Sequence, residues 1–557
     1  MRRIIGAVVL SATAFTTVWL KAQGREWTTA SYDAQRTGWV RTDASLTRDA
    51  VQKGNFQFLW KAKFENETRQ LNSLTTPIIL DRLIGYRGFK ALGFIGGSAD
   101  RVFAIDTDLA RPYWTTHLNY SAATGGQPSS SWECPGGLIA MPTRRTVLAP
   151  QPPPTGGGGA RGGRSGSAVG EPGRGAAVLS QQPVGRGRGG APPPPAPAPG
   201  GRAVAPIPFG GVDPVYAVGS DGFLHTLSSA NGADMTAPVP FLPPNTKPSA
   251  LIFVDGVVYT TTSSGCGAAP NAVWAIDLTA DNKVTSWNTG GADIVGTTGP
   301  AFRGDGTLYI ALGNAPPRGD RTYANAIVAL DRVTLQPRDY FSAPGVEFNT
   351  APIVIRYRSD ADFVVATAND GRMYLLDGAG LGGADHKTPL HVTAKYTAPG
   401  ATAGLATWES QGTRWILAPV SGAPPASLKF APNGPAPSGG IVAFKLVDRG
   451  ASVAIEPAWA SRNMTSPLAP IVVNGLVFAV SSGEYRGSGA QLTAAQRAQR
   501  SIPAVLYVLD GTTGKQLWTS GTTITSFARG GLSAAAGQVY LVTYDNHLYA
   551  FGIPMEH

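Results

Sequence analysis

Short apolar segments recur along the chain, and glycine-rich breaks separate them from one another. A second apolar segment lies shortly before most copies, as at residues 256–260 and 475–479. Short strands at regular spacing, joined by turn residues, are typical of four-stranded antiparallel propeller blades. The eight copies of the recurring segment, several of them degenerate, are Val102–Asp106, Leu224–Ser228, Val273–Asp277, Ile327–Asp331, Met373–Asp377, Ile441–Lys445, Leu506–Asp510 and Leu548–Phe551.

No alternating helical pattern accompanies these strands, so the sequence predicts an all-β fold, an eight-bladed β-propeller of four-stranded antiparallel blades. The eighth copy ends at Phe551 and leaves no room for an outer strand. Residues 56–64 form an additional apolar segment near the N-terminus, and this segment contains Trp60. We expect it to close the ring as the outer strand of the last blade, because that pairing removes an open sheet edge.

A tryptophan follows several copies at a nearly constant distance. The clearest case is Asp510-Gly-Thr-Thr-Gly-Lys-Gln-Leu-Trp518, in which Asp510 and Gly511 favour a tight turn and Gly514 permits a positive φ. A large ring on the outer strand can fill the wedge between adjoining blades. The predicted blade-docking residues are Trp60, Trp114, Trp287, Trp459 and Trp518, and Tyr340 takes this place in the fourth blade.

Residues 506–518, Leu-Tyr-Val-Leu followed by Asp-Gly-Thr-Thr-Gly-Lys-Gln-Leu-Trp, resemble the tryptophan-docking repeat of quinoprotein propellers, the PQQ-like β-propeller family. The resemblance covers nearly the whole mature chain. It is specific in the last full repeat and degenerate elsewhere. It implies eight blades, and it names pyrroloquinoline quinone (PQQ) and calcium as the cofactors of the family's dehydrogenases.

The sequence divides into a signal peptide (1–23), an N-terminal extension (24–55) and the propeller (56–557), which contains a Gly/Pro/Arg-rich insert (146–208). Arg2 and Arg3 precede an apolar run and small residues, as in a secretory signal. A retained membrane anchor is the alternative, since the run is just long enough to span a bilayer. We expect a periplasmic or secreted protein with no membrane span after cleavage and no lipid-anchor cysteine.

The net charge of +10 does not indicate a nucleic-acid-binding face. The insert contains six arginines and one glutamate, and the signal peptide contains three basic residues. The rest of the chain therefore carries a net charge of only +2, which excludes a broad phosphate-binding surface. The composition of the insert predicts a disordered, solvated loop.

Two cysteines, Cys134 and Cys266, are predicted to form a disulfide, because an exported chain with an even number of cysteines favours pairing. Cys134 precedes the second blade, and Cys266 lies between the two middle strands of the third. Such loops share one face of a propeller, so the bridge is geometrically reasonable. Two separate buried thiols are the alternative.

The same face supplies candidate ligand residues, one from the loop that leads into each innermost strand. These positions could equally well hydrate a central channel. The six histidines are scattered and no dense Asp/Asn loop occurs, so no metal site is expected. The candidates are Asn72, Glu133, Lys247, Thr298, Asn349, Trp408, Ser466 and Arg529.

Two function classes remain open, and with them the question whether the chain is an enzyme. The first is a binding or scaffold protein of the cell envelope, a monomer that binds an envelope protein or a small polar ligand. The second is a periplasmic PQQ-dependent alcohol or sugar dehydrogenase, in which Glu133, Asn349 and Trp408 supply calcium-binding and stacking groups. The family resemblance implies adjacent cysteines in such an enzyme. The sequence has none, which favours the first class.

Overall fold

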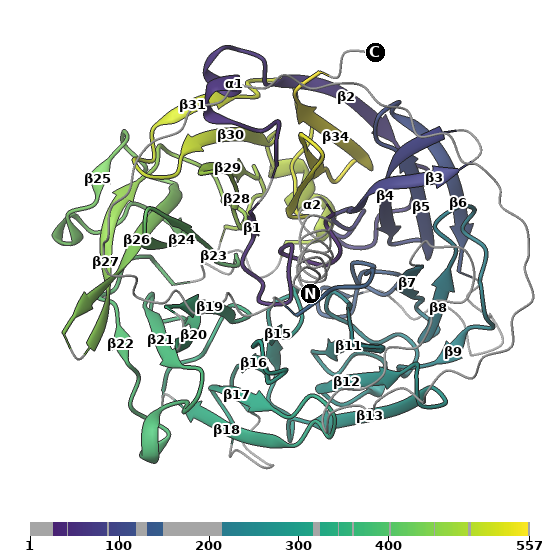
Figure 1. The fold of residues 1–557 in the computed structure, drawn as a ribbon, viewed down its shortest axis with the longest axis horizontal. Helices are drawn as coiled ribbons and strands as arrows, with labels where there is room; N and C mark the ends of the chain where they lie inside the picture. Colours follow the sequence, from purple (N-terminus) through teal and green to yellow (C-terminus); the bar gives the residue numbers. More distant parts are fainter. Residues whose placement is uncertain are drawn as a thin grey trace, which may run out of the picture.

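Eight small β-sheets stand around a central axis in the computed structural model, which confirms the all-β, eight-bladed propeller (Figure 1). The predicted signal peptide and most of the predicted insert lie outside the described residues. The structure describes residues 26–41, 43–85, 88–118, 131–148, 214–315, 323–342, 345–358, 361–399, 403–450, 452–487 and 492–554.

The first four blades follow one another along the chain. Blade 1 contains β3 (Ile78–Gly85), β4 (Gly88–Gly97), β5 (Arg101–Asp106) and β6 (Arg111–His117). Blade 2 contains β7 (Val215–Val218), β8 (Phe223–Leu227) and β9 (Val239–Pro240). Blade 3 contains β10 (Ile252–Val254), β11 (Val257–Thr262), β12 (Ala272–Asp277) and β13 (Lys283–Asn288). Blade 4 contains β14 (Ile294–Val295), β15 (Ala301–Phe302), β16 (Leu308–Leu312), β17 (Ala326–Leu330) and β18 (Pro337–Ser342).

The other four blades continue around the ring. Blade 5 contains β19 (Ile353–Tyr357), β20 (Ala361–Thr367), β21 (Met373–Asp377) and β22 (His391–Val392). Blade 6 contains β23 (Ala406–Ser410), β24 (Thr413–Ser421), β25 (Ala431–Pro432), β26 (Gly439–Arg449) and β27 (Ser452–Ala460). Blade 7 contains β1 (Trp39–Val40), β28 (Ile471–Val473), β29 (Leu476–Ser481), β30 (Val505–Asp510) and β31 (Gln516–Thr519). Blade 8 contains β2 (Gln57–Lys63), β32 (Leu532–Ala535), β33 (Gln538–Val542) and β34 (His547–Gly552).

Helices are short and lie between strands. Among the described residues they are the α-helices α1 (Arg48–Gln52) and α2 (Ala494–Arg500) and three 3-10 turns at Cys266–Ala268, Gly383–Asp385 and Ala426–Leu428.

Blade 4 has two short inner strands, β14 and β15, that both pair with β16. Three other blades depart from four antiparallel strands in two ways. In blade 2 a single bridge between Thr143 and Tyr216 takes the place of an innermost strand. In blades 6 and 7 a short fifth strand, β25 or β1, pairs in parallel with its neighbour. Both differences arise where a connecting segment, not a hairpin, supplies the edge of the sheet.

Each recurring apolar segment forms the third antiparallel strand of its blade, counted outward from the axis, with the Thr143 bridge counted as the innermost strand of blade 2 and the parallel strands β1 and β25 left out. In β17 every residue from Ala326 to Leu330 is buried. The blades stack face to face, so both sides of such a strand are covered and neither set of alternating positions needs to be polar. This packing explains why the third strands are the clearest repeat in the sequence.

The predicted closure of the ring is confirmed. The strand β2 pairs antiparallel with β34, with Trp60 opposite Ala550 and Ala62 opposite Leu548. Figure 1 shows the two strands side by side although they come from opposite ends of the chain. The first and last parts of the propeller therefore share one sheet. The outer edge of β34 is covered by β2 and is not left unpaired.

Residues 26–40 of the predicted N-terminal extension, here called the N-terminal segment, lie at the centre of the ring. Their backbone or side chains bond the inner parts of blades 1 to 7 in blade order. The bonds join Trp27 to Ile79, Thr28 to Arg144, Thr29 to Leu251, Ala34 to Phe302, Gln35 to Val354, Thr37 to Thr407 and Gly38 to Val472.

Arg36 holds the N-terminal segment against the fourth blade and joins two parts of the segment to each other. Its guanidinium donates to the carbonyl oxygens of Pro300 and Ala30 and to the hydroxyl of Thr29. The side chain is 1% exposed, and burial lowers the pKa of Arg36 to about 9, although Asp33 offsets part of this effect. A buried cation of this kind persists because it is hydrogen-bonded.

The predicted docking tryptophans lie at contacts between neighbouring blades. Trp60, Trp114 and Trp459 each donate their indole N–H to the backbone of the next blade, at the carbonyls of Thr107, Ser229 and Gly511. Each of these carbonyls directly follows the last residue of a recurring segment. The same hydrogen bond thus links the outer strand of one blade to the turn of the next.

The two other tryptophans make ring contacts. Trp518 packs edge-on against Phe56, with ring centroids 4.8 Å apart. Trp287 packs edge-on against Tyr323, which in turn contacts Tyr340 of the fourth blade. Aromatic packing of this geometry adds to the burial of apolar surface between blades.

The tryptophan of the preceding blade leaves no space for a side chain at Gly514. It has a φ of +73°, and a Cβ at this position would lie 2.4 Å from the ring of Trp459. Gly232 stands in the same relation to Trp114, at 2.5 Å. The glycine therefore serves both the turn and the close approach of the ring.

We predict that Gly514→Ala destabilises the protein more than Gly521→Ala. Both glycines have positive φ, but no atom lies within 4 Å of a Cβ at Gly521. The control should cost about 1–2 kcal/mol through backbone strain alone, and Gly514→Ala about 1–3 kcal/mol more through the clash with Trp459. Urea unfolding of both variants measures the difference, and equal losses would contradict the role of Trp459.

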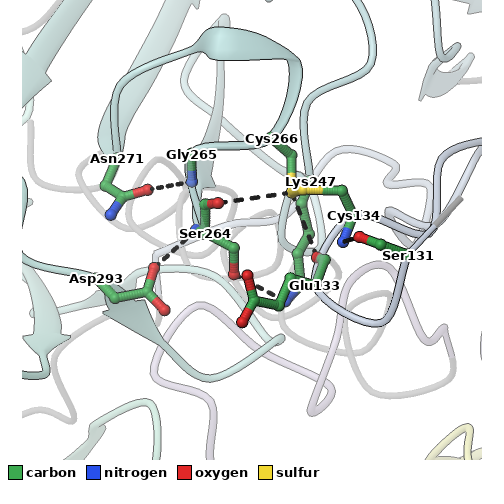
Figure 2. Close-up of a disulfide and its surroundings, with 9 residues drawn as sticks. All are labelled: Ser131, Glu133, Cys134, Lys247, Ser264, Gly265, Cys266, Asn271 and Asp293. Atoms are coloured by element: carbon green, nitrogen blue, oxygen red, sulfur yellow. Dashed lines mark hydrogen bonds between the residues drawn. A yellow bond between two sulfur atoms is a disulfide. The ribbon is translucent and has the colours of Figure 1, made fainter. Parts of the chain in front are cut away.

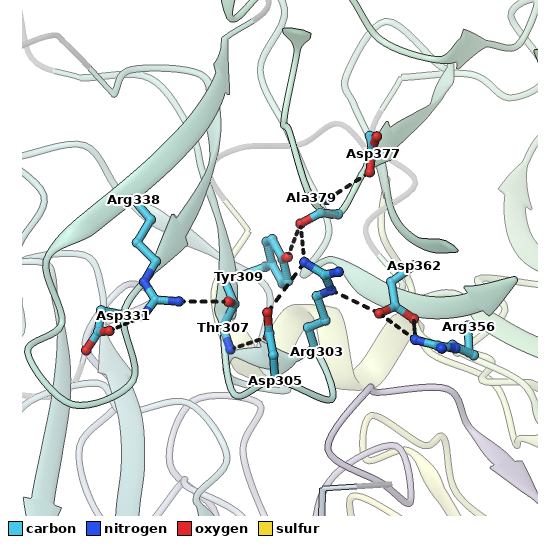
Figure 3. A network of polar contacts seen from close by, with 11 residues as sticks. Arg303, Asp305, Thr307, Tyr309, Asp331, Arg338, Arg356, Asp362, Asp377 and Ala379 are labelled. Carbon is cyan, nitrogen blue, oxygen red and sulfur yellow. Dashed lines mark hydrogen bonds and ion pairs between the residues drawn. The ribbon is translucent and has the colours of Figure 1, made fainter. Parts of the chain in front are cut away.

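Ion pairs join blades 4, 5 and 6 on the face opposite the cysteine loops. Figure 3 shows Asp362 between Arg303 and Arg356, with nitrogen–oxygen distances of 2.9 and 3.1 Å. Asp362 is 6% exposed. Arg414 of blade 6 donates to the carbonyl oxygen of Arg356 and pairs with Glu409. The network links neighbouring blades at a depth where a lone carboxylate would be costly.

We predict that Asp362→Asn lowers the free energy of unfolding by at least about 2 kcal/mol, because two arginines lose their charged acceptor. Asp305→Asn is the matched control. Asp305 also pairs with Arg303, at 3.4 Å, but it is 44% exposed, so its loss should cost less than about 1 kcal/mol. Chemical unfolding of the two variants provides the comparison, and the prediction fails if their losses are equal.

Candidate functional site

A cavity of about 350 Å³ lies on the axis of the ring. The N-terminal segment contributes Ala30, Ser31 and Gly38 to its wall. The loops leading into the innermost strands of blades 1, 2, 3, 4, 6, 7 and 8 supply most of the remainder. We call this cavity the central funnel. Its size is at the lower end of the range for small-molecule sites.

The charged residues among those that line the central funnel are Arg486 and Arg529. Arg486 lies between β29 and β30, and Arg529 precedes β32. Both side chains are about one-third exposed. Glu484 lies behind them and is 1% exposed. The wall therefore presents two guanidinium groups, and the carboxylate nearest to them is buried.

Glu484 holds both arginines through their Nε atoms. Its Oε2 accepts from Arg486 Nε at 2.8 Å, and its Oε1 lies 3.0 Å from Arg529 Nε. Ser466 donates its hydroxyl to the carbonyl oxygen of Glu484 and fixes the backbone from the neighbouring loop. The terminal Nη groups of both arginines have no acceptor among the described residues.

The predicted disulfide is present in loops of the face that also supplies Arg486 and Arg529, here called the mouth of the central funnel. Cys134 and Cys266 are joined by a bond of 2.08 Å with Cα atoms 5.4 Å apart. Figure 2 shows the bridge beside Glu133, Lys247 and Ser264. The bridge ties the loop before blade 2 to the β11–β12 loop of blade 3, as the shared face of these loops led us to expect.

Lys247 extends the positive charge of the site toward the disulfide. It donates to the Ser264 hydroxyl at 3.1 Å. Burial lowers the pKa of Lys247, while the carboxylates of Asp293 and Glu133 partly offset this effect. The positive charge of Arg529 lowers the pKa of Lys247 further. Lys247 and Arg529 thus lie close enough to influence each other electrostatically.

The helix α2 lies near the centre of the ring in Figure 1, and it contacts Trp132 in the loop that carries Cys134. It begins after Thr493, which forms a reciprocal capping pair with Gln496. The carbonyl oxygen of Leu492 accepts from the Trp132 indole at 3.3 Å, and the Arg497 guanidinium lies 4.7 Å from the ring centre of Trp132. Insertions of blades 7 and 2 therefore contact each other beside the mouth.

The structure brings several of the predicted site residues together. Asn72, Thr298 and Arg529 line the central funnel. Ser466 contacts Glu484 directly behind it, and Lys247 and Glu133 lie at the disulfide. These six residues share one face of the propeller.

Two predicted residues lie elsewhere. Asn349 is engaged within blade 5, where it bonds Asn369 and Thr367. Trp408 is not at the mouth of the ring. It lies in β23, is 4% exposed and stacks on Trp415 in the core between blades 6 and 7.

Sequence reasoning missed Glu484, Arg486 and Tyr544, of which Arg486 and Tyr544 line the central funnel. Glu484 and Arg486 belong to the connection between β29 and β30, which runs from residue 482 to 504. The signal that could have found them is this length, since other blades join their two middle strands by shorter connections, such as 313–325 in blade 4. Long connections at one face often carry function.

Metal-binding groups do not gather in the part of the chain that the structure describes. No cluster of three or more His, Cys, Asp or Glu side chains that could hold an ion occurs there. No described helix is both long and apolar enough to cross a membrane.

Comparison with known proteins identifies relatives by fold alone. No family model matches the sequence, and no curated protein matches it. Quinohemoprotein alcohol dehydrogenase from Comamonas testosteroni is 13% identical, with a TM-score of 0.56, over 97% of this chain and 82% of that one. Quinohemoprotein alcohol dehydrogenase ADHIIG from Pseudomonas putida HK5 is 12% identical, with a TM-score of 0.53, over 96% and 81%.

A third solved structure, a europium-containing methanol dehydrogenase, is 10% identical with a TM-score of 0.52 and covers 96% of this chain and 99% of that one. The chain therefore has the eight-bladed fold of the PQQ-like quinoprotein propellers, as the repeat at residues 506–518 predicts. At this identity the likeness establishes the fold and leaves the activity to be argued from the site.

We predict that replacing Cys134 and Cys266 together by Ala lowers the free energy of unfolding by about 2–4 kcal/mol, the usual contribution of a disulfide. The bridge joins loops and not strands, so the variant should keep the far-ultraviolet circular dichroism of the parent protein. Urea unfolding, compared with that of the parent protein under non-reducing conditions, measures the loss. An unchanged midpoint would show that the bridge does not stabilise the ring.

Proposed function

We propose that this chain is an exported binding propeller that holds a small polar ligand in its central funnel. The observation that carries the proposal is the funnel itself, a cavity of about 350 Å³ with arginine, amide and hydroxyl groups in its wall. The N-terminal segment lines it and bonds seven blades, so ligand access is expected from the face of the disulfide loops. A rigid concave site with few polar groups is typical of small-molecule binding.

A quinone–calcium centre does not fit the residues present. Glu133 lies at the disulfide, Asn349 is bonded within blade 5, and Trp408 is buried between blades 6 and 7. Their contacts lie in different parts of the ring, and Trp408, the predicted stacking group, is enclosed in the core. The three residues therefore do not form one calcium and stacking site, and a calcium ion needs six or more oxygen ligands. The cysteines are 132 residues apart in sequence, and their bridge ties two loops at the mouth. We therefore derive no dehydrogenase step for this chain.

Export is supported by the disulfide. A bridge between Cys134 and Cys266 is stable in an oxidising compartment such as the periplasm or the extracellular space. The predicted signal peptide (1–23) agrees with this location, and it remains a prediction because it lies outside the described residues. A small ligand is favoured over an envelope protein as partner, because the polar groups face an internal cavity.

Reconstitution with the quinone cofactor distinguishes a binding protein from a PQQ-dependent dehydrogenase. The purified protein is incubated with PQQ and Ca²⁺ and assayed for dye reduction with alcohols and aldoses. We expect no turnover above a heat-denatured control, because Asn349 is engaged within blade 5 and Trp408 lies in the core, so neither is placed with Glu133 at a quinone–calcium centre. Turnover that depends on both PQQ and Ca²⁺ would overturn the binding-protein proposal and establish the dehydrogenase.

A further inference from the structure

The two arginines in the wall of the central funnel form an anion-binding pair. Arg486 and Arg529 come from different blades, and both are held by Glu484. Each uses Nε for this contact. Guanidinium groups bind carboxylates and phosphates through parallel N–H donors, and here the Nη donors are the ones left without a described acceptor.

Burial supports a ligand-binding role over a purely structural ion pair. Glu484 is 1% exposed, whereas the side chains of Arg486 and Arg529 are 33% and 37% exposed and border the cavity. A structural bridge would satisfy the arginines within the protein. The arrangement instead anchors them from behind and leaves their outer edges accessible to a molecule in the cavity.

The charges indicate how many anionic groups the ligand carries. Two guanidinium groups and one carboxylate leave a net charge of +1 in this cluster, which one anionic group would balance. The remaining wall offers uncharged groups, among them the Asn72 amide and the Thr298 hydroxyl. These groups suit an uncharged, hydroxylated body next to the anionic group.

We infer that the central funnel binds a small organic anion, with one carboxylate or phosphate group held by Arg486 and Arg529. The inference rests on the proposed binding function and specifies its ligand. The inference concerns only the charged group of the ligand. The experiment therefore tests a carboxylate and a phosphate ester separately.

The test is isothermal titration of the purified chain with D-glucuronate, D-glucose 6-phosphate and D-glucose at low ionic strength. At least one of the anionic sugars should bind about 10-fold to 100-fold more tightly than glucose, because a hydrogen bond to a charged group contributes about 1.5–3 kcal/mol. The comparison of the two anions shows whether the site prefers carboxylate or phosphate. Added NaCl should weaken the binding, since the interaction is between charges.

Arg529→Gln and Arg486→Gln should each lower the affinity for the bound anion about 10-fold or more. Arg500→Gln is the matched control, because it removes the same charge from α2 but does not line the funnel. Its affinity should remain within about threefold, since an exposed charge is largely screened. If a glutamine variant fails to fold, Arg529→Lys is measured in its place. This substitution keeps the positive charge and removes the planar guanidinium with its paired N–H donors.

Each outcome decides the inference. Anion binding that depends on Arg486 and Arg529 supports it. If glucose and the anions bind equally well, or if all three arginine variants lose the same affinity, the anion site is overturned. The proposed binding of a small polar ligand would be unaffected by either result. Binding of none of the three sugars at millimolar concentration overturns the inference. Quinone-dependent turnover, measured separately, overturns the proposed function itself.

Discussion

The structure depends on how the inner and outer edges of its sheets are closed. A propeller blade exposes backbone groups at both edges, and unpaired groups there are costly when buried and prone to pairing with other chains when exposed. In this chain the N-terminal part covers both kinds of edge, the inner and the outer. Residues 27–38 bond the inner parts of seven blades in order, and β2 completes the outer edge of the eighth.

Closure by the N-terminal part also shapes the candidate site. Ala30, Ser31 and Gly38 line the cavity at the axis, so the N-terminal segment forms part of the wall of the central funnel. The buried guanidinium of Arg36 bonds the carbonyl oxygen of Pro300 in blade 4 and that of Ala30 within the segment. A rigid wall lets a few side chains from different blades be held at constant distances, which is what a specific binding site needs.

Function on a shared fold is decided in the loops. Three pairs of neighbouring blades share one repeated contact, in which a tryptophan on an outer strand bonds the turn of the next blade, as Trp459 bonds Gly511. The loops at the mouth vary instead. The connection that carries Glu484 and Arg486 replaces a short turn, and its helix α2 contacts Trp132 of the disulfide loop. The likeness to quinohemoprotein dehydrogenases concerns the ring, while these loops set the chemistry of the funnel.

The sequence by itself determined the blades, their closure and the disulfide. Each follows from a local pattern: an apolar third strand, an unpaired strand around Trp60, and two cysteines in loops of one face. Only the tertiary structure decided the site. Trp408 was predicted at the mouth, but it lies in a strand, where the register sends alternate side chains to opposite faces, and it enters the core beside Trp415. The N-terminal segment and the Glu484 cluster escaped notice for a different reason. Their contacts join residues hundreds of positions apart or on separate blades, and no local periodicity records such distances.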